Sequence, residues 1–281
     1  MTTGIEKITF NGLPAVRITA PDGATATILN LGAHIVSWIP AGGDERLYLS
    51  DKSAFKVGEA VRGGVPVCFP QFGGRGNLPK HGFARLVEWT ETESRVGKDF
   101  ATATFTLTDD EASRKIWPHA FAVELTVLIS GQRLDIELGV KNQGENALSF
   151  TGALHTYLRM REVEEVKIEG LHGLRYLDAP TGVEHDETGV DLTIEAETDR
   201  VYFDANRPVL VREPHRSLGI GKENFADVVV WNPWEKNSAA IADLPDNGFR
   251  YMLCVEAAAV NKPVELAPGA EWWGRQTIAA L

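Results

Sequence analysis

The chain has 281 residues, with 28 Lys or Arg against 39 Asp or Glu, so its formal net charge is −11. An acidic chain lacks the basic face that neutralises phosphates, so we expect neither a nucleic-acid partner nor binding to an anionic membrane. No apolar run approaches the roughly 18 residues that span a bilayer, and the first residues do not resemble a signal peptide. Two cysteines are too few for a disulfide scaffold, which favours a cytoplasmic protein.

Alternation of apolar and polar residues with a period of two dominates the chain. It is clearest in Ala101–Thr108 and Arg133–Lys141, and such alternation is typical of half-buried antiparallel strands. Further alternating runs cover residues 8–18, 24–38, 123–130, 148–160, 163–168, 192–196 and 249–258. Many strands separated by Gly, Pro, Asn and Asp predict an all-β protein, a large sandwich or barrel. Because no linker or change of composition interrupts residues 1–281, we expect one domain.

Few segments favour a helix. Thr108 and Asp109 are predicted to cap a short helix through Glu111–Lys115, and a single turn is predicted near Ser238–Ile241. The acidic stretch Leu174–Glu197 is predicted to be a loop-rich insertion within the sheets.

Two neighbouring segments combine glycines, prolines and cations. Arg62–Gly73 reads RGGVPVCFPQFG, and because Gly permits positive φ and Pro fixes φ, it predicts a tight turn followed by a rigid extended stretch. Leu78–Arg85 reads LPKHGFAR and brings Lys80, His81 and Arg85 into one loop. Such a cluster favours an anion site, since guanidinium presents a fork of donors. A solvated loop with a hydrogen-bonded histidine is the alternative.

Two later predicted strands carry ionisable side chains that are candidates for acid–base chemistry. In Leu148–Met160, alternation places His155 on the same face as Tyr157, away from the apolar residues. In Phe249–Ala258, Glu256 shares its face with apolar neighbours. Burial of a carboxyl raises its pKa, which makes Glu256 a candidate base. A structural histidine and a salt-bridged glutamate are the alternatives.

Several motifs together carry a family resemblance. They are RGGVPVCFPQFG, HGFAR, LHTYLRM, TDRVYF, VVWNPWEKNSAAIADL and MLCVEAA, in order from Arg62 to Glu256. With them the chain resembles the hexose-6-phosphate 1-epimerase branch of the aldose-1-epimerase-like, or galactose mutarotase-like, family. The resemblance implies a large antiparallel β-sandwich, called a supersandwich. It also implies interconversion of the α and β anomers of a hexose 6-phosphate, with no cofactor and no metal, and we expect a monomer.

The resemblance also implies roles for individual residues. His155 and Glu256 would be the catalytic pair. The implied substrate contacts are Arg62, Lys80, His81, Arg85 and Asp199. Lys80 stands where the family usually has Gln, and Asp178 competes with Asp199 for the sugar hydroxyls.

This pair suits the expected reaction. Opening a pyranose ring removes a proton from the C1 hydroxyl and adds one to the ring oxygen, so one base and one acid suffice. Glu256 would be the base. His155, whose type titrates near pH 6.5, would be the acid.

Other functions predict different residues. A non-catalytic carbohydrate-binding protein would not need the pair of His155 and Glu256, and a mutarotase of free aldoses such as galactose would not need Arg62 and Arg85. A retaining glycosidase needs two carboxylates about 5–5.5 Å apart, but only one candidate stands out. The EHDE motif at Glu184–Glu187 lacks a second His at metal-ligand spacing.

Overall fold

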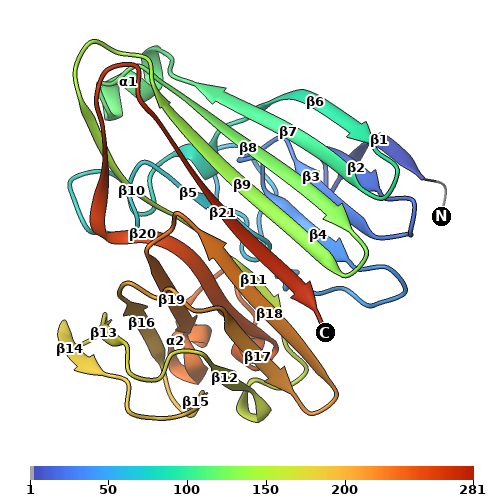
Figure 1. Ribbon diagram of the computed structural model, residues 1–281, viewed down its shortest axis with the longest axis vertical. Coiled ribbons are helices and arrows are strands. Elements are labelled where there is room, and N and C mark those ends of the chain that lie inside the picture. The colour runs from blue at the N-terminus through green and yellow to red at the C-terminus, as the bar shows by residue number, and fades with distance from the viewer. Residues whose placement is uncertain (1–2) are drawn as a thin grey trace.

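The computed structural model describes residues 3–281, which form three antiparallel β-sheets and little helix (Figure 1). The four-stranded sheet consists, in spatial order, of β1 (Gly4–Phe10), β2 (Leu13–Thr19), β3 (Thr25–Leu29) and β4 (Ile35–Ile39). These sheets confirm the predicted all-β class.

The eight-stranded sheet carries most of the residues singled out from the sequence. Its order is β14 (Val183–Asp186), β13 (Arg175–Asp178), β16 (Thr198–Tyr202), β19 (Asp227–Asn232), β20 (Met252–Leu266), β10 (Leu148–Leu154) and β5 (Val67–Cys68). A short strand, β11 (Tyr157–Arg159), also pairs with β20.

The nine-stranded sheet runs along the length of the molecule in Figure 1. Its order is β15 (Leu192–Thr193), β12 (Lys167–Glu169), β17 (Val209–Glu213), β18 (Arg216–Glu223), β21 (Glu271–Ala280), β9 (Arg133–Asn142), β8 (Phe121–Ser130), β7 (Ala101–Thr108) and β6 (Thr90–Val96).

A shared apolar core joins the sheets. Ile28 from β3, Phe105 from β7, Leu125 from β8 and Val255 from β20 all belong to one cluster of buried side chains. Because successive side chains of a strand point to opposite faces, each strand that contributes to this core has a second face available for other purposes. In the eight-stranded sheet that second face forms the floor of a cleft.

The helices are short, and their predicted ends need correction. Helix α1 (Glu111–Ile116) lies where it was predicted, but its N-cap is Asp110, whose carboxylate accepts a hydrogen bond from the backbone N–H of Ser113 at 2.7 Å. The predicted cap, Asp109, instead accepts from Arg114. The predicted turn near residue 238 is the longer helix α2 (Trp234–Ala240). Short 3₁₀ turns cover Ala84–Leu86, Val163–Glu165 and Gly248–Tyr251.

One other prediction about the strands was wrong, and a second lacked detail. Residues 174–197 are loop-rich as predicted, and they also supply β13 and β14 at one edge of the eight-stranded sheet and β15 at one edge of the nine-stranded sheet. The run 148–160 is not one strand, because it breaks between β10 and β11 at His155 and Thr156. No helix within residues 3–281 is long and apolar enough to cross a membrane.

Candidate active site

The floor of the cleft is the face of the eight-stranded sheet that points away from the shared core. On β20, Val255 joins the core, whereas Cys254 belongs to a separate cluster on the opposite face, the face that Glu256 shares. The register pairs Glu256 with Val229 and pairs Trp231 with Asp199. Residues directly opposite each other project to the same side of a sheet, so alternation brings Glu256 and Asp199 to one surface.

The break between β10 and β11 positions His155 beside Glu256. At the break, Thr156 accepts a hydrogen bond from the backbone N–H of Val255 at 3.1 Å, and its hydroxyl donates to Gln276 at 2.5 Å. The His155 ring stacks on Tyr157, with 4.8 Å between ring centroids. Its Nδ1 lies 3.3 Å from Oε1 of Glu256, so residues far apart in sequence meet within reach of a proton transfer.

His81 forms one wall of the cleft, and its neighbour Gly82 permits this position. A Cβ on Gly82 would lie 2.0 Å from the carbonyl oxygen of Phe69, so only glycine fits there. The backbone N–H of Gly73 donates to Nδ1 of His81 at 3.3 Å, and Cys68 Sγ lies 3.2 Å from the same nitrogen. Because Nδ1 accepts, the ring proton belongs on Nε2.

The cleft has a volume of about 330 Å³. Six of the residues predicted for the site line it, namely Arg62, Lys80, His81, His155, Asp199 and Glu256. Arg62 is held in place, because its Nη1 donates to the Tyr157 hydroxyl at 3.0 Å and its Nε donates to Asp243 at 3.1 Å. Lys80 is exposed at the rim.

Two predicted residues lie outside the cleft lining, and the lining includes one cation that was not predicted. Arg85 does not line the cleft, and its Nη2 donates to the carbonyl oxygen of Lys80 at 3.1 Å. Asp178 also lies outside the lining and accepts a hydrogen bond from the Thr181 hydroxyl. Arg75, which the sequence interpretation missed, is an exposed lining residue. It follows two glycines in a loop without periodicity, so no sequence pattern marked it.

Burial perturbs the ionisable groups on the floor. Burial, with the charge of Asp199 adding to it, raises the pKa of Glu256 well above its usual value. Burial and the nearby positive groups lower the pKa of His155 well below 6.5. Burial also raises the pKa of Asp199 to about 6, although Lys80 and Arg75 oppose this shift. In the free cleft the pair of His155 and Glu256 therefore favours its neutral form.

The pair also lacks hydrogen-bond partners. In the part of the chain that the structure describes, neither carboxyl oxygen of Glu256 nor Nδ1 of His155 makes a hydrogen bond, since the 3.3 Å approach between them is poorly aligned. The side chains are only 1% and 9% exposed. Buried polar atoms normally have partners because leaving them unpaired is costly. Groups left without partners at the bottom of a cleft are therefore available to a ligand.

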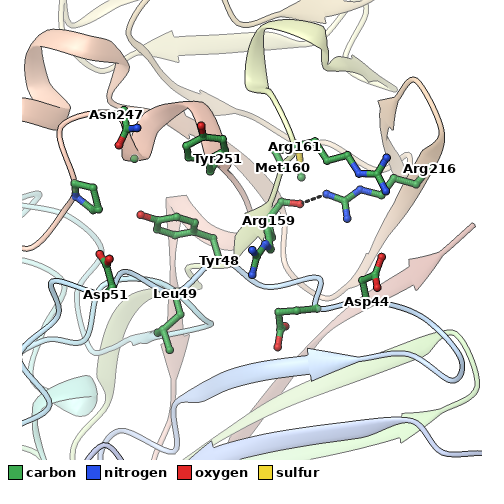
Figure 2. Close-up of a pocket in the computed structure, with 13 residues that line it drawn as sticks. Asp44, Tyr48, Leu49, Asp51, Arg159, Met160, Arg161, Arg216, Asn247 and Tyr251 are labelled. Atoms are coloured by element: carbon green, nitrogen blue, oxygen red, sulfur yellow. Dashed lines mark hydrogen bonds between the residues drawn. The ribbon is translucent and has the colours of Figure 1, made fainter.

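A larger cavity, of about 820 Å³, lies elsewhere and contains none of the predicted site residues (Figure 2). Two of its charged side chains, Glu45 and Arg216, are engaged by the protein itself. Glu45 accepts hydrogen bonds from the backbone N–H groups of Trp38 and Leu47, both at 2.9 Å. Arg216 donates to the carbonyl oxygen of Arg159 at 2.8 Å. Size alone does not mark a candidate site, and the buried acid–base pair, without hydrogen-bond partners among residues 3–281, lies in the smaller cleft.

Comparison with known proteins shows the family to which the chain belongs. The family model described as aldose 1-epimerase matches residues 14–279. The chain belongs to this family. Members of the aldose 1-epimerase family are isomerases, and the supersandwich implied by the motifs is the fold of this chain.

Its relatives share most of its length. A Cenchrus ciliaris protein named "Putative glucose-6-phosphate 1-epimerase" is 37% identical over 97% of this chain and 86% of its own. A protein of Escherichia coli strain K12 with the same name is 37% identical over 82% of this chain and 78% of its own. The crystal structure of a "putative mutarotase (YeaD)" from Salmonella typhimurium superimposes with a TM-score of 0.91 at 31% identity, covering 98% of this chain and 93% of that one.

Proposed function

We propose that this aldose 1-epimerase acts on D-hexose 6-phosphates, with glucose 6-phosphate as the representative substrate. The observation that carries the proposal is an unpartnered pair, His155 and Glu256, at the bottom of a cleft whose rim holds Arg75 and Lys80. The names of the relatives support the same substrate class.

The proposed reaction needs one proton on the pair. In the reactive form Glu256 is a carboxylate and His155 carries the proton, and the 3.3 Å separation lets the proton pass between them. The C1 hydroxyl of the sugar donates to Glu256, and such a hydrogen bond favours the carboxylate that burial disfavours. Glu256 takes the C1 hydroxyl proton, the C1–ring oxygen bond breaks, and His155 protonates the ring oxygen.

The open-chain aldehyde then completes the change of anomer. Rotation about the C1–C2 bond presents the other face of the aldehyde to the C5 hydroxyl. Reclosure reverses the proton transfers, with His155 as base and Glu256 as acid. Asp199, on the same face of the sheet, would accept hydrogen bonds from sugar hydroxyls, and His81 would donate one through Nε2.

Recognition of the phosphate is assigned to Arg75 and Lys80, with Arg62 as a third cation of the cleft. Arg62 already forms an ion pair with Asp243. Arg75 and Lys80 are exposed, so their side chains can reorient to bind the phosphate dianion. Arg85 would act indirectly by holding the Lys80 carbonyl. Local cations are needed, because a net charge of −11 repels an anionic substrate.

The test compares anomer interconversion of glucose 6-phosphate and of glucose. Losing a charge-assisted hydrogen bond costs about 1.5–3 kcal/mol, so Arg75→Ala should lower kcat/KM for the phosphate by roughly 10–150-fold. The value for glucose should stay nearly constant. Arg275→Ala, on the outer face of the nine-stranded sheet, is the matched control. A wild-type preference for free glucose or galactose would contradict the proposal and favour a free-sugar mutarotase.

A further inference from the structure

A third side chain joins the pair of His155 and Glu256. One imidazole nitrogen of His155, Sγ of Cys254 and a carboxylate oxygen of Glu256 all lie within 4.8 Å of one another. Cys254 and Glu256 are two residues apart on β20, so both project to the same face. His155 reaches them from the break between β10 and β11. We call these three residues the thiol–imidazole–carboxylate cluster.

The cluster is deeply buried, and several of its polar atoms have no hydrogen-bond partner within residues 3–281. Cys254 is fully buried, and the side chains of His155 and Glu256 are 9% and 1% exposed. Nδ1 of His155 and both oxygens of Glu256 have no hydrogen-bond partner in the described residues. Several converging ligand atoms without hydrogen-bond partners form an arrangement that a cation satisfies once the thiol and carboxyl protons are released.

From this convergence we propose that the thiol–imidazole–carboxylate cluster is a binding site for a borderline-soft divalent ion such as Zn²⁺. Thiolate and imidazole ligands select zinc or cobalt over magnesium and calcium, which prefer oxygen ligands. Zinc bonds of about 2.0–2.3 Å in a tetrahedron place ligand atoms about 3.3–3.8 Å apart. The 3.3 Å between His155 and Glu256 already matches, and small side-chain rotations would bring Sγ of Cys254, which lies within 4.8 Å of both ligand atoms, to the same spacing.

The charges and protons of this step balance. The thiol of Cys254 and the carboxyl of Glu256, both protonated in the free cleft, each release one proton to solvent as their bonds to zinc form, and His155 binds as the neutral imidazole. Two negative ligands then neutralise the two positive charges of the ion. Three protein ligands leave a fourth position that water occupies on the side of the cleft.

Bound zinc would inhibit the enzyme. The ion would occupy the two groups assigned above to proton transfer, so the occupied form could not open the sugar ring. This consequence depends on the proposed function, whereas binding of the ion does not. The two are therefore tested by separate readouts.

Binding is tested by optical spectroscopy with Co²⁺, added to the full chain after treatment with a chelator. A thiolate ligand gives a sulfur-to-cobalt charge-transfer band in the near ultraviolet, which should saturate at one equivalent. Cys254→Ala should abolish the band. Cys68→Ala, which removes the other cysteine, should retain it. Absence of the band in the unaltered chain, or its persistence in Cys254→Ala, would overturn the site.

Inhibition is tested by anomerase assays with Zn²⁺ or Mg²⁺, each variant being compared with its own metal-free turnover. We expect Zn²⁺ but not Mg²⁺ to inhibit, and Cys254→Ala to raise the half-inhibitory Zn²⁺ concentration at least tenfold. Equal Zn²⁺ sensitivity of Cys254→Ala and the unaltered chain would overturn the site. A saturated cobalt band with undiminished turnover would support the metal site and contradict the acid–base roles of His155 and Glu256 instead.

Discussion

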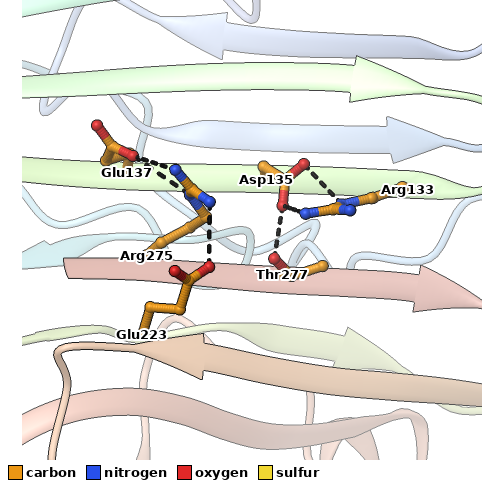
Figure 3. A network of polar contacts seen from close by, with 6 residues as sticks. All are labelled: Arg133, Asp135, Glu137, Glu223, Arg275 and Thr277. Atoms are coloured by element: carbon orange, nitrogen blue, oxygen red, sulfur yellow. Dashed lines mark hydrogen bonds and ion pairs between the residues drawn. The ribbon is translucent and has the colours of Figure 1, made fainter.

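Ionisable side chains on the outer face of the nine-stranded sheet have hydrogen-bond partners, whereas those of the pair on the floor of the cleft have none in the part of the chain that the structure describes. On the outer face, Arg275 donates to Glu137 at 2.8 Å and to Glu223 at 3.0 Å (Figure 3). Close by, Asp135 accepts from Arg133 at 2.8 Å and from the Thr277 hydroxyl at 2.5 Å. Every group in this network has a partner within the protein.

On the floor of the cleft, charged groups are fewer, more buried and less satisfied. Among residues 3–281, none donates a hydrogen bond to Glu256, and burial raises its pKa. Exposed ion pairs contribute little to stability because water and salt screen them. A buried, unpartnered carboxyl is costly and would be retained for chemistry rather than for folding. The comparison therefore favours a reactive role for the floor of the cleft and little energetic role for the outer network.

The largest effect is expected at Glu256. Glu256→Gln keeps the shape but removes the proposed base, so turnover should fall by on the order of 10²-fold or more in an assay of anomer interconversion. Folding should be retained, because a neutral amide replaces a carboxyl of the same shape that burial already keeps neutral. Glu265→Gln, an exposed position on the same strand, is the matched control and should be near normal.

A double variant sharpens the same prediction. If His155 and Glu256 exchange one proton, then removing His155 after Glu256 should add little further loss. His155→Ala with Glu256→Gln should therefore be almost as active as the slower single variant. Fully multiplicative losses would separate the two residues and contradict a shared proton.

A smaller effect is expected at Asp199, whose pKa is raised to about 6. Protonation removes a hydrogen-bond acceptor, so KM should rise, by about tenfold, as pH falls below 6. Asp199→Asn should have a raised KM at neutral pH and should lose this pH dependence. Asp178→Asn, on the neighbouring strand outside the cleft, should keep the dependence of the unaltered enzyme.

Ionised Asp199 should help substrate binding but lower the free energy of unfolding. Its folded pKa lies above the usual value of 3.8, so the folded state binds more protons and stability falls as pH rises from about 4 to 6. Replacing it with Asn should stabilise the protein by on the order of 1–2 kcal/mol at pH 7. The gain should vanish near pH 3 in denaturant titrations. Destabilisation at pH 7 would show that Asp199 supports the fold.

The sequence predicted the parts of this site that depend on strand periodicity. Alternation correctly placed Glu256 on the face of β20 shared with Cys254, because a period of two follows from strand geometry alone. It could not reveal that Thr156 interrupts the strand before Tyr157. That break depends on contacts with Val255 and Gln276, which are distant in sequence.

Loop residues were harder to predict because no period governs them. Sequence proximity grouped Arg85 with Lys80, but the side chain of Arg85 turns back to the Lys80 carbonyl. Arg75 was missed because its surrounding glycines carry no directional signal. Asp243, which pairs with Arg62, lies after α2 and is brought close only by the fold. The catalytic role proposed for His155 came from the family motifs and not from strand periodicity.

The smallest effect on stability and turnover is expected from substitutions on the outer face of the nine-stranded sheet. Arg275→Ala removes the centre of the network in Figure 3. Because its partners can rehydrate, the free energy of unfolding should fall by less than about 1 kcal/mol, and less still at high salt. Turnover should be unchanged for both glucose 6-phosphate and glucose. A loss of activity in Arg275→Ala would mean that the nine-stranded sheet positions the floor of the cleft through β21. The contact would be Gln276, which is next to Arg275 and accepts a hydrogen bond from Thr156. Gln276→Ala would then produce the same loss, whereas Arg133→Ala, in the same network but on β9, would not.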